Sequence, residues 1–250
     1  MNHRFQSFEP SKSQSLVLVA EDHETNRRLA TYMLESLGYR ADFAVNGREA
    51  IEAWERSSYD VIIMDCQMPE MDGFEATREI RRREAARPAG GGERIRIVAL
   101  TANALKGDAE RCLAAGMDGY LSKPYTAQQI GAALKEHCGR PGHAAPPATA
   151  GPAHRVAAGF DPQRPAQLCA ELDDEGVRGI IEDFLADVPR QIPEIGVLAK
   201  AGRRSEAGRL AHSLRGISLS FGLVRFGSHL REIEEQAEGE DEAGCVRRDA

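Results

Sequence analysis

A short apolar run that ends in a carboxylate constrains the fold of this chain more than any other feature. Residues 61–64 read Val-Ile-Ile-Met, Asp65 follows directly, and Pro69 and Gly73 interrupt the segment beyond it. A β-branched run of this length, bounded by Pro and Gly, indicates a buried strand that ends in a loop. Because a strand that is apolar on both faces belongs in a sheet covered by helices on both sides, the run predicts an α/β fold. Ligands of such folds bind beyond the carboxyl ends of the strands, which is where Asp65 stands.

The same pattern recurs along residues 16–138, where strand-like and helix-like segments alternate. The alternation predicts one doubly wound domain with a five-stranded parallel sheet and right-handed crossovers. The expected strands cover residues 16–20, 39–44, 61–65, 95–101 and 118–121. A first helix is expected around Leu29 to Leu37, and the other four cover residues 47–56, 75–86, 104–115 and 127–138.

The composition changes after residue 138. Residues 139–159 are dominated by Gly, Ala and Pro without apolar periodicity, which predicts a linker. From residue 160 to residue 250 apolar side chains recur at helical spacing, which predicts a small antiparallel helical bundle. The chain turns polar after Ala237, so we expect a long final helix to be missing and the bundle to be incomplete. Residues 1–15 are polar and are interpreted as a disordered lead-in.

Composition also excludes several classes of protein. The formal net charge of −7 argues against a dedicated nucleic-acid binder, and no apolar stretch has the length that a membrane-spanning helix needs. The five cysteines are scattered without Cys-x-x-Cys spacing, which indicates reduced thiols rather than a disulfide framework or a zinc site. The amino-terminal residues lack the apolar core of a secretory signal. We therefore expect a cytoplasmic chain with no direct nucleic-acid contact and no membrane segment.

Three carboxylates are expected to meet at the carboxyl edge of the sheet. Glu21 and Asp22 follow the first strand and Asp65 ends the third, and these strands are neighbours in the commonest order of such folds. Mutual repulsion makes such a cluster costly unless a cation is present. Oxygen ligands with room for water suit Mg²⁺, so the sequence predicts a magnesium site.

Two further side chains complete a site for a phosphoryl group. Thr101 and Lys123 end the fourth and fifth strands, and they bring a hydroxyl donor and a cation to the same edge. Mg²⁺ and Lys123 would neutralise the phosphoryl oxygens, and Thr101 would donate to one of them. Asp65 would then be free to act as the nucleophile.

Residues 16–138 resemble a response-regulator receiver domain of two-component signalling. The resemblance implies a flavodoxin- or CheY-like sheet of order 2-1-3-4-5, joined here to an all-α bundle. Motifs that occur together in the right order are much harder to obtain by chance than one motif alone. They are Val19–Asp22, Ile63–Gly73, Ala99–Ala102 and Leu121–Pro124.

The same resemblance implies roles for individual residues. Asp65 would be the phosphoacceptor, and Thr101 and Tyr120 would form the switch pair. The Lys123–Pro124 bond would be cis, which is an uncommon conformation. The metal ligands would be Glu21, Asp22, Asp65 and the main-chain carbonyl of Gln67.

His212 lies in the apolar pattern at residues 210–217. It is about 160° from the centre of that apolar stripe at about 100° per residue, so it is predicted to face solvent. Arg215, three residues on, could neutralise a phosphoryl group on His212, and Gly216 leaves room for a second protein. A neutral imidazole near pH 7 is a competent nucleophile. The other six histidines are interpreted as ordinary side chains.

The segment His212–Gly216 resembles the histidine phosphotransfer (Hpt) domain, whose signature reads His-x-Leu-Lys-Gly. The resemblance implies that His212 is a phosphotransfer histidine. Arg215 stands where that signature has Lys, which preserves the charge but not the geometry.

The sequence as a whole predicts a phosphorelay signal-transduction protein. Asp65 would take a phosphoryl group from a phosphohistidine of an upstream histidine kinase, and His212 would exchange one with a receiver domain of this chain or of a partner regulator. Hydrolysis at Asp65 would be self-dephosphorylation. The direction of phosphate flow stays open.

The sequence also allows functions other than a phosphorelay within this chain. The chain could be the carboxyl-terminal part of a hybrid histidine kinase, or an interaction module that phosphorylation controls without internal relay. It lacks a Gly-rich ATP-binding segment, so kinase activity is not expected of it. A phosphatase of the haloacid dehalogenase type is disfavoured, because Gln67 occupies the position of the second Asp in that family.

Overall fold

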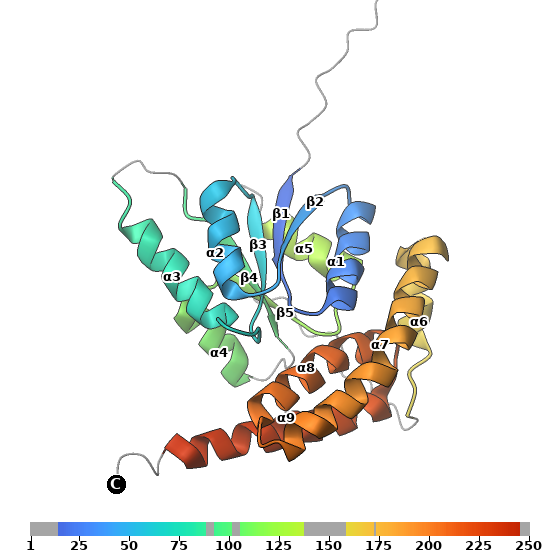
Figure 1. Ribbon diagram of the computed structural model, residues 1–250. Coiled ribbons are helices and arrows are strands. Elements are labelled where there is room, and N and C mark those ends of the chain that lie inside the picture. The colour runs from blue at the N-terminus through green and yellow to red at the C-terminus, as the bar shows by residue number, and fades with distance from the viewer. Residues whose placement is uncertain (1–14, 89–92, 102–105, 138–158, 173, 246–250) are drawn as a thin grey trace, which may run out of the picture.

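The computed structural model describes residues 15–88, 93–101, 106–137, 159–172 and 174–245, which form an α/β domain and a helical bundle (Figure 1). The strands are β1 (Leu16–Ala20), β2 (Arg40–Ala44), β3 (Val61–Asp65), β4 (Arg96–Thr101) and β5 (Gly119–Ser122). The helices that alternate with them are α1 (Glu24–Ser36), α2 (Gly47–Arg56), α3 (Gly73–Ala85), α4 (Lys106–Ala115) and α5 (Ala127–His137). The predicted lead-in at 1–15 and linker at 139–159 fall almost wholly outside the described residues.

The sheet is parallel and has the order β2-β1-β3-β4-β5, as predicted. Ala20 of β1 is in register with Met64 of β3, and Asp65 is in register with Leu100 of β4. Thr101 is likewise in register with Ser122 of β5. The carboxyl ends of four strands therefore lie along one edge, which brings the residues that follow them together.

Two apolar layers cover the sheet. Val61 and Ile63 of β3 point into the layer with α1 and α5, whereas Ile62 and Met64 point into the layer with α2 and α3. This alternation follows from the two-residue period of a strand. Because both faces are covered, the whole of β3 is buried, as its continuous apolar run predicts.

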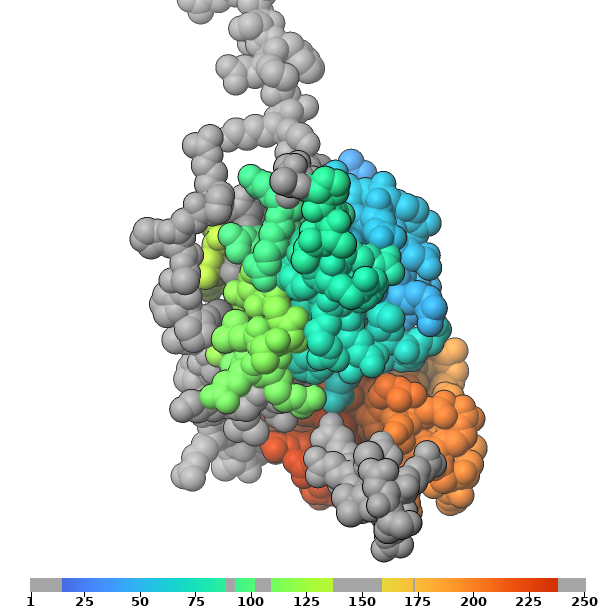
Figure 2. Space-filling model, turned by 90° about the vertical axis from the view of Figure 1, so that its left-hand side faces the viewer, coloured from blue at the N-terminus to red at the C-terminus, as the bar shows by residue number. Residues whose placement is uncertain are grey.

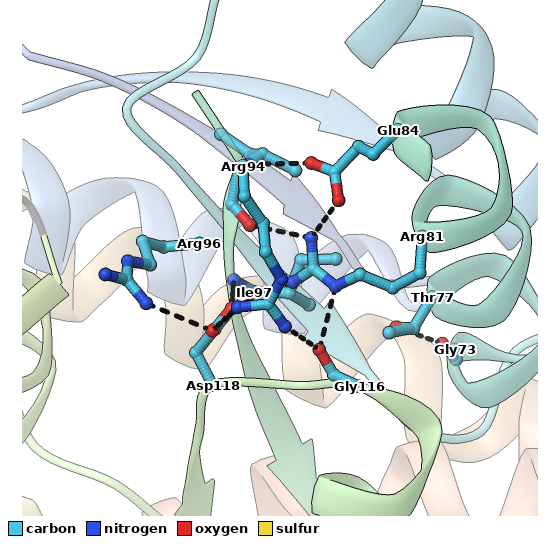
Figure 3. Close-up of polar contacts among 10 residues, drawn as sticks. Gly73, Thr77, Arg81, Glu84, Arg94, Arg96, Ile97, Gly116 and Asp118 are labelled. Atoms are coloured by element: carbon cyan, nitrogen blue, oxygen red, sulfur yellow. Dashed lines mark hydrogen bonds and ion pairs between the residues drawn. The ribbon is translucent and has the colours of Figure 1, made fainter. Parts of the chain in front are cut away.

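An ion-pair network fixes α3 against the amino ends of β4 and β5 (Figure 3). Arg81 of α3 donates to Glu84 at 2.6 Å and to Asp118 at 2.8 Å. The Asp118 carboxylate also accepts from Arg94 and Arg96. The Arg81 and Asp118 side chains are largely buried, so solvent screens this network less than an exposed pair. The network lies at the edge opposite the strand-end carboxylates.

Gly73 begins α3 where the chain passes over the end of β3. A Cβ atom on Gly73 would lie 2.0 Å from the main-chain oxygen of Asp65 and 2.9 Å from Cγ of Met64. Such an approach to backbone is not sterically possible, so a residue without Cβ is required. The preceding Asp72 caps the helix, because its Oδ1 accepts from the amide of Glu75 at 2.6 Å. The turn thus starts α3 directly against the strand end that carries Asp65.

Four helices form the bundle: α6 (Gln163–Glu171), α7 (Asp174–Lys200), α8 (Arg204–Ser220) and α9 (Val224–Cys245). The expectation that a long final helix is missing was wrong, because α9 continues through the polar segment after Ala237. Glu and Ala are frequent in that segment, and they favour helix without an apolar stripe. α7 also runs on through Pro189 and Pro193.

The bundle packs beneath the carboxyl edge of the sheet, with α1 in contact with both α7 and α8 (Figure 1). The side view toward α3 and α4 shows the same arrangement, with the bundle in orange and red below the α/β domain (Figure 2). The apolar layer on the α1 face continues into the bundle and includes Ile180 and Phe184 of α7 and Leu214 of α8. The two parts therefore share one apolar core.

We expect Gly73→Ala to lower the free energy of unfolding by about 3 kcal/mol, because the added methyl group must displace the backbone of β3. Gly196→Ala in α7 is the matched control, since nothing lies within 4 Å of its added Cβ. That substitution is expected to stabilise the chain by roughly 0.5–1 kcal/mol through helix propensity. Urea unfolding followed by circular dichroism measures both changes, and equal effects would contradict the steric explanation.

Candidate functional site

The three predicted carboxylates do converge. Oxygen atoms of Glu21, Asp22 and Asp65 all lie within 4.8 Å of one another at the ends of β1 and β3. Glu21 and Asp65 are buried, with 1% and 0% of their surface exposed. Buried oxygen donors at this spacing fit a divalent cation of the kind that prefers oxygen ligands.

Lys123 links two of these carboxylates. Its buried Nζ atom donates to Oε2 of Glu21 at 2.7 Å and to Oδ2 of Asp65. The amide of Lys123 donates to the carbonyl oxygen of Thr101 at 2.7 Å, which continues the pairing of β4 with β5. The Lys123–Pro124 bond is cis, as predicted. One cation thus stands against two carboxylates, and Asp22 lies outside this pairing.

The three carboxylates outnumber the one lysine, and their pKa values reflect this excess of negative charge. Burial raises the pKa of Asp22 to about 7, and the neighbouring Glu21 and Asp65 carboxylates add to the rise. Burial likewise raises the pKa of Asp65 to about 6, against the opposing charge of Lys123. Burial alone would also raise the pKa of Glu21, but the charge and hydrogen bond of Lys123 bring it down to about 2. The site therefore holds more negative charge than Lys123 compensates.

The remaining predicted receiver-site residues lie around this cluster. The amide of Gln67 donates to Oδ1 of Asp65 at 3.2 Å. Thr101 is buried at the end of β4, and Tyr120 is half-buried against the apolar layer of α2 and α3. The carbonyl ligand at Gln67 and the switch pair of Thr101 and Tyr120 stay predictions.

His212 is buried, with 4% of its surface exposed, so the prediction that it faces solvent was wrong. Glu234 of α9 lies 3.6 Å from its Nδ1, and the neighbouring Ser213 and Gly216 of α8 lie against the α/β domain, so both parts of the chain meet around this turn of α8. After burial and the charges of Lys123 and Glu21, His212 is the next influence on the pKa of Asp65 and lowers it. The imidazole is therefore within electrostatic range of Asp65, the candidate phosphoacceptor.

Glu234 of α9 is a site residue that the sequence reasoning missed. Its Oε2 atom lies 3.6 Å from Nδ1 of His212, and Arg215 donates to the same oxygen at 2.5 Å. Neither imidazole nitrogen of His212 has a hydrogen-bond partner among the described residues. The only sequence signal for Glu234 is an acidic residue beside the apolar position Ile233 in the third helical stripe. The role predicted for Arg215 toward a phosphoryl group stays a prediction.

Asn26 and Ser213 also escaped the sequence analysis. Nδ2 of Asn26 donates to Oε1 of Glu21 at 2.9 Å and to the carbonyl oxygen of Ser213 at 3.2 Å. The hydroxyl of Ser213 donates to Oδ1 of Asp22 at 3.0 Å. These bonds attach the residue after His212 directly to the carboxylate cluster.

Comparison with known families assigns both parts of the chain. The family model of the response regulator receiver domain matches residues 17–135, and that of the Hpt domain matches residues 179–248. The chain contains a receiver domain followed by an Hpt domain. It thus combines the two domain types of a phosphorelay. No helix within the described ranges is long and apolar enough to cross a membrane.

Known proteins resemble this chain over about half of its length or more. The chain is 34% identical over 212 residues to the virulence sensor protein BvgS of Bordetella bronchiseptica, covering 83% of this chain and 17% of BvgS. It is 39% identical over 160 residues to probable histidine kinase 1 of Oryza sativa subsp. indica, covering 54% and 16%. The crystal structure of the PA1611 receiver domain from Pseudomonas aeruginosa is 43% identical, covers 51% of this chain and 100% of that one, and superposes with a TM-score of 0.46. The chain thus spans about a sixth of the length of these curated relatives.

We expect the stability of the wild type, relative to Asp22→Asn, to fall as the pH rises from about 5 to about 8 in a chelator. The folded pKa of Asp22, about 7, lies above the value of 3.8 for an exposed Asp. The folded state therefore keeps a proton that the unfolded state loses, so the free energy of unfolding decreases through this window. The relative loss should be roughly 1–3 kcal/mol by urea unfolding at each pH. A difference that does not change with pH would refute the electrostatic account.

Proposed function

We propose that this chain is a phosphorelay component in which Asp65 accepts a phosphoryl group and His212 exchanges one with an aspartate. The observation that carries the proposal is a buried imidazole beside the carboxylate cluster, with no hydrogen-bond partner among the described residues. Leaving a buried polar group unpaired costs about 1–3 kcal/mol, so a structural role for His212 does not account for it. A role as a nucleophile does account for it, because the imidazole nitrogen must then stay free to reach a phosphoryl group.

Glu21, Asp22 and Asp65, with the carbonyl of Gln67, would hold Mg²⁺. The carboxylates lie close enough to share one ion, and their excess negative charge favours it. When bound, the ion supplies positive charge to the phosphoryl oxygens.

The side chains of the site have separate roles in the phosphoryl transfer. An Oδ atom of Asp65 attacks phosphorus of a phosphohistidine, the phosphorus–nitrogen bond breaks, and its electron pair returns to the imidazole. Lys123 neutralises a phosphoryl oxygen from the position in which it now holds Asp65, and the hydroxyl of Thr101 donates to another. His212 accepts a phosphoryl group by the reverse exchange, in which the Asp oxygen leaves as a carboxylate.

Glu234 is proposed as a positioning residue for His212. A carboxylate beside Nδ1 favours the tautomer with hydrogen on Nδ1, which leaves the lone pair of Nε2 for phosphorus. Arg215 holds the carboxylate in place by its hydrogen bond to Oε2. This arrangement gives Arg215 a structural task that a Lys of different geometry would perform less well.

The partners follow from this chemistry. The donor to Asp65 would be the phosphohistidine of an upstream histidine kinase, and a further partner would be a receiver domain. We place the chain in the cytoplasm, where thiols stay reduced, because its five cysteines are scattered without the spacing of a disulfide framework or a zinc site. A second candidate is that the same domains form part of a longer hybrid histidine kinase, which the similarity to probable histidine kinase 1 supports.

Incubation with acetyl phosphate and Mg²⁺ is expected to add one acid-labile phosphoryl group in the wild type and none in Asp65→Asn. Intact mass spectrometry measures the addition, and EDTA is expected to abolish it. His212→Gln is expected to keep the label on Asp65. Label that persists in Asp65→Asn at the same level would exclude Asp65 as the acceptor.

We expect Glu234→Gln to slow phosphoryl exchange at His212 by roughly tenfold, because the imidazole loses the group that orients it. Glu232→Gln is the matched control, since Glu232 is exposed on the same helix. The ¹⁵N chemical shifts of the His212 ring should report a changed tautomer population in Glu234→Gln alone. Unchanged ring shifts together with an unchanged rate would remove Glu234 from the site.

A further inference from the structure

Polar contacts join the receiver and Hpt domains at the phosphorylation site itself. We infer that the Hpt domain of this chain is the docking partner of its own receiver domain, so that Asp65 and His212 exchange the phosphoryl group within one chain. The inference rests on the proposed function and adds the partner and the surface that selects it.

A ladder of polar pairs connects α1 to α7. Arg28 forms an ion pair with Asp183, and the Thr25 hydroxyl donates to Oδ2 of Asp187 at 2.8 Å. One turn further, Nε2 of His23 lies 2.8 Å from the amide nitrogen of Gln191. The α7 members recur every four residues and share one helix face. Residue numbers increase along α1 from pair to pair while they decrease along α7. The two helices therefore run antiparallel in a defined register.

Two glycines lie where the Hpt backbone faces side chains of the receiver domain. A Cβ on Gly179 of α7 would lie 3.4 Å from a guanidinium nitrogen of Arg28. A Cβ on Gly216 of α8 would lie 3.4 Å from Cδ of Lys123 and 3.6 Å from the side chain of Asn26. These are contact distances, so the turn of α8 that follows His212 lies against the lysine of the site.

The contacts reach the reacting groups and also extend beyond them. Through Asn26 and the Ser213 hydroxyl, α8 is bonded to Glu21 and Asp22, as described above. At the other end of the interface, Oε2 of Glu171 in α6 accepts from the amide of Ala127 at 2.9 Å. This carboxylate meets the positive amino end of α5. Pairs of opposite charge, hydrogen bonds and shared apolar packing thus all favour the same docked arrangement.

The length of chain between the domains favours docking within one molecule. Residues 138–158 connect them, and a segment of that length can reach about 70 Å at full extension. A short tether gives an effective concentration on the order of millimolar for the second domain. A separate protein at micromolar concentration would have to bind this receiver face much more tightly to displace it.

The exchange itself balances without a further reactant. A nitrogen of His212 attacks phosphorus on phospho-Asp65, the Asp oxygen–phosphorus bond breaks, and the carboxylate leaves with the electron pair. The proton released from the imidazole passes to solvent, and the reverse reaction restores both groups.

The test is a charge swap at the ion pair of Arg28 and Asp183, at one end of the ladder, in the full chain. Asp65 is loaded with acetyl phosphate and Mg²⁺, and base-stable phosphohistidine is then followed by intact mass and alkaline treatment. Arg28→Asp and Asp183→Arg should each slow its appearance about tenfold, because like charges would face each other. The double swap should restore the rate to within about threefold. Arg82→Asp is the matched control, because the Arg82 side chain is exposed on α3, and it should leave the rate unchanged.

Each outcome is decisive. Single swaps without effect, or a double swap without rescue while the fold is intact by circular dichroism, would overturn the docking register. Loss of label from Asp65 itself would instead count against the proposed function, because that step needs no docked Hpt domain.

Mixing chains tests the intramolecular route separately. Wild-type transfer should be independent of protein concentration. A mixture of Asp65→Asn and His212→Gln chains must transfer between molecules, so it should be slower at micromolar protein and should accelerate with concentration. Equal rates for the mixture and the wild type would show that the partner lies on another molecule.

Discussion

The buried Lys123 ammonium between Glu21 and Asp65 is the interaction on which the rest of the site depends. Two buried carboxylates repel each other strongly in a medium of low dielectric constant. A buried ion pair offsets its desolvation cost only when its geometry is held. Lys123 follows β5, whereas its partners follow β1 and β3, so the sheet must fix three distant segments relative to one another. The register of the parallel strands fixes these segments, and buried backbone hydrogen bonds and two apolar layers hold that register.

Asp22 lies outside the ion pairs of Lys123 with Glu21 and Asp65, so its negative charge is not compensated there. The surplus would favour a divalent cation, and the Asp22 carboxylate also accepts a hydrogen bond from Ser213 of the Hpt domain. The amide of Asn26 bridges Glu21 to the same segment of α8. The carboxylates that would hold the metal are thus the ones that contact the Hpt domain.

The sequence allowed good prediction of the α/β domain, because its signals are local. The apolar run before Asp65 acts over a few residues, and the structure buries the whole of that run as a strand. The part of α9 after Ala237 was missed, because the sequence there carries no apolar period. Glu234 was missed because it is far from His212 along the chain, and only the crossing of α8 and α9 brings them together.

By itself the sequence determined that carboxylates end neighbouring buried strands, that a lysine and a threonine join them, and that a histidine lies off the core stripe of a bundle helix. These properties follow from strand and helix periods, which are local. Only the tertiary structure decided that His212 is covered rather than exposed, because α9, the helix that packs against it, is distant along the chain. It likewise decided which side chains of α1 meet α7 and α8, since contacts between helices depend on how two folded surfaces fit. Periodicity orients a residue within its own element, whereas burial depends on everything that packs against it.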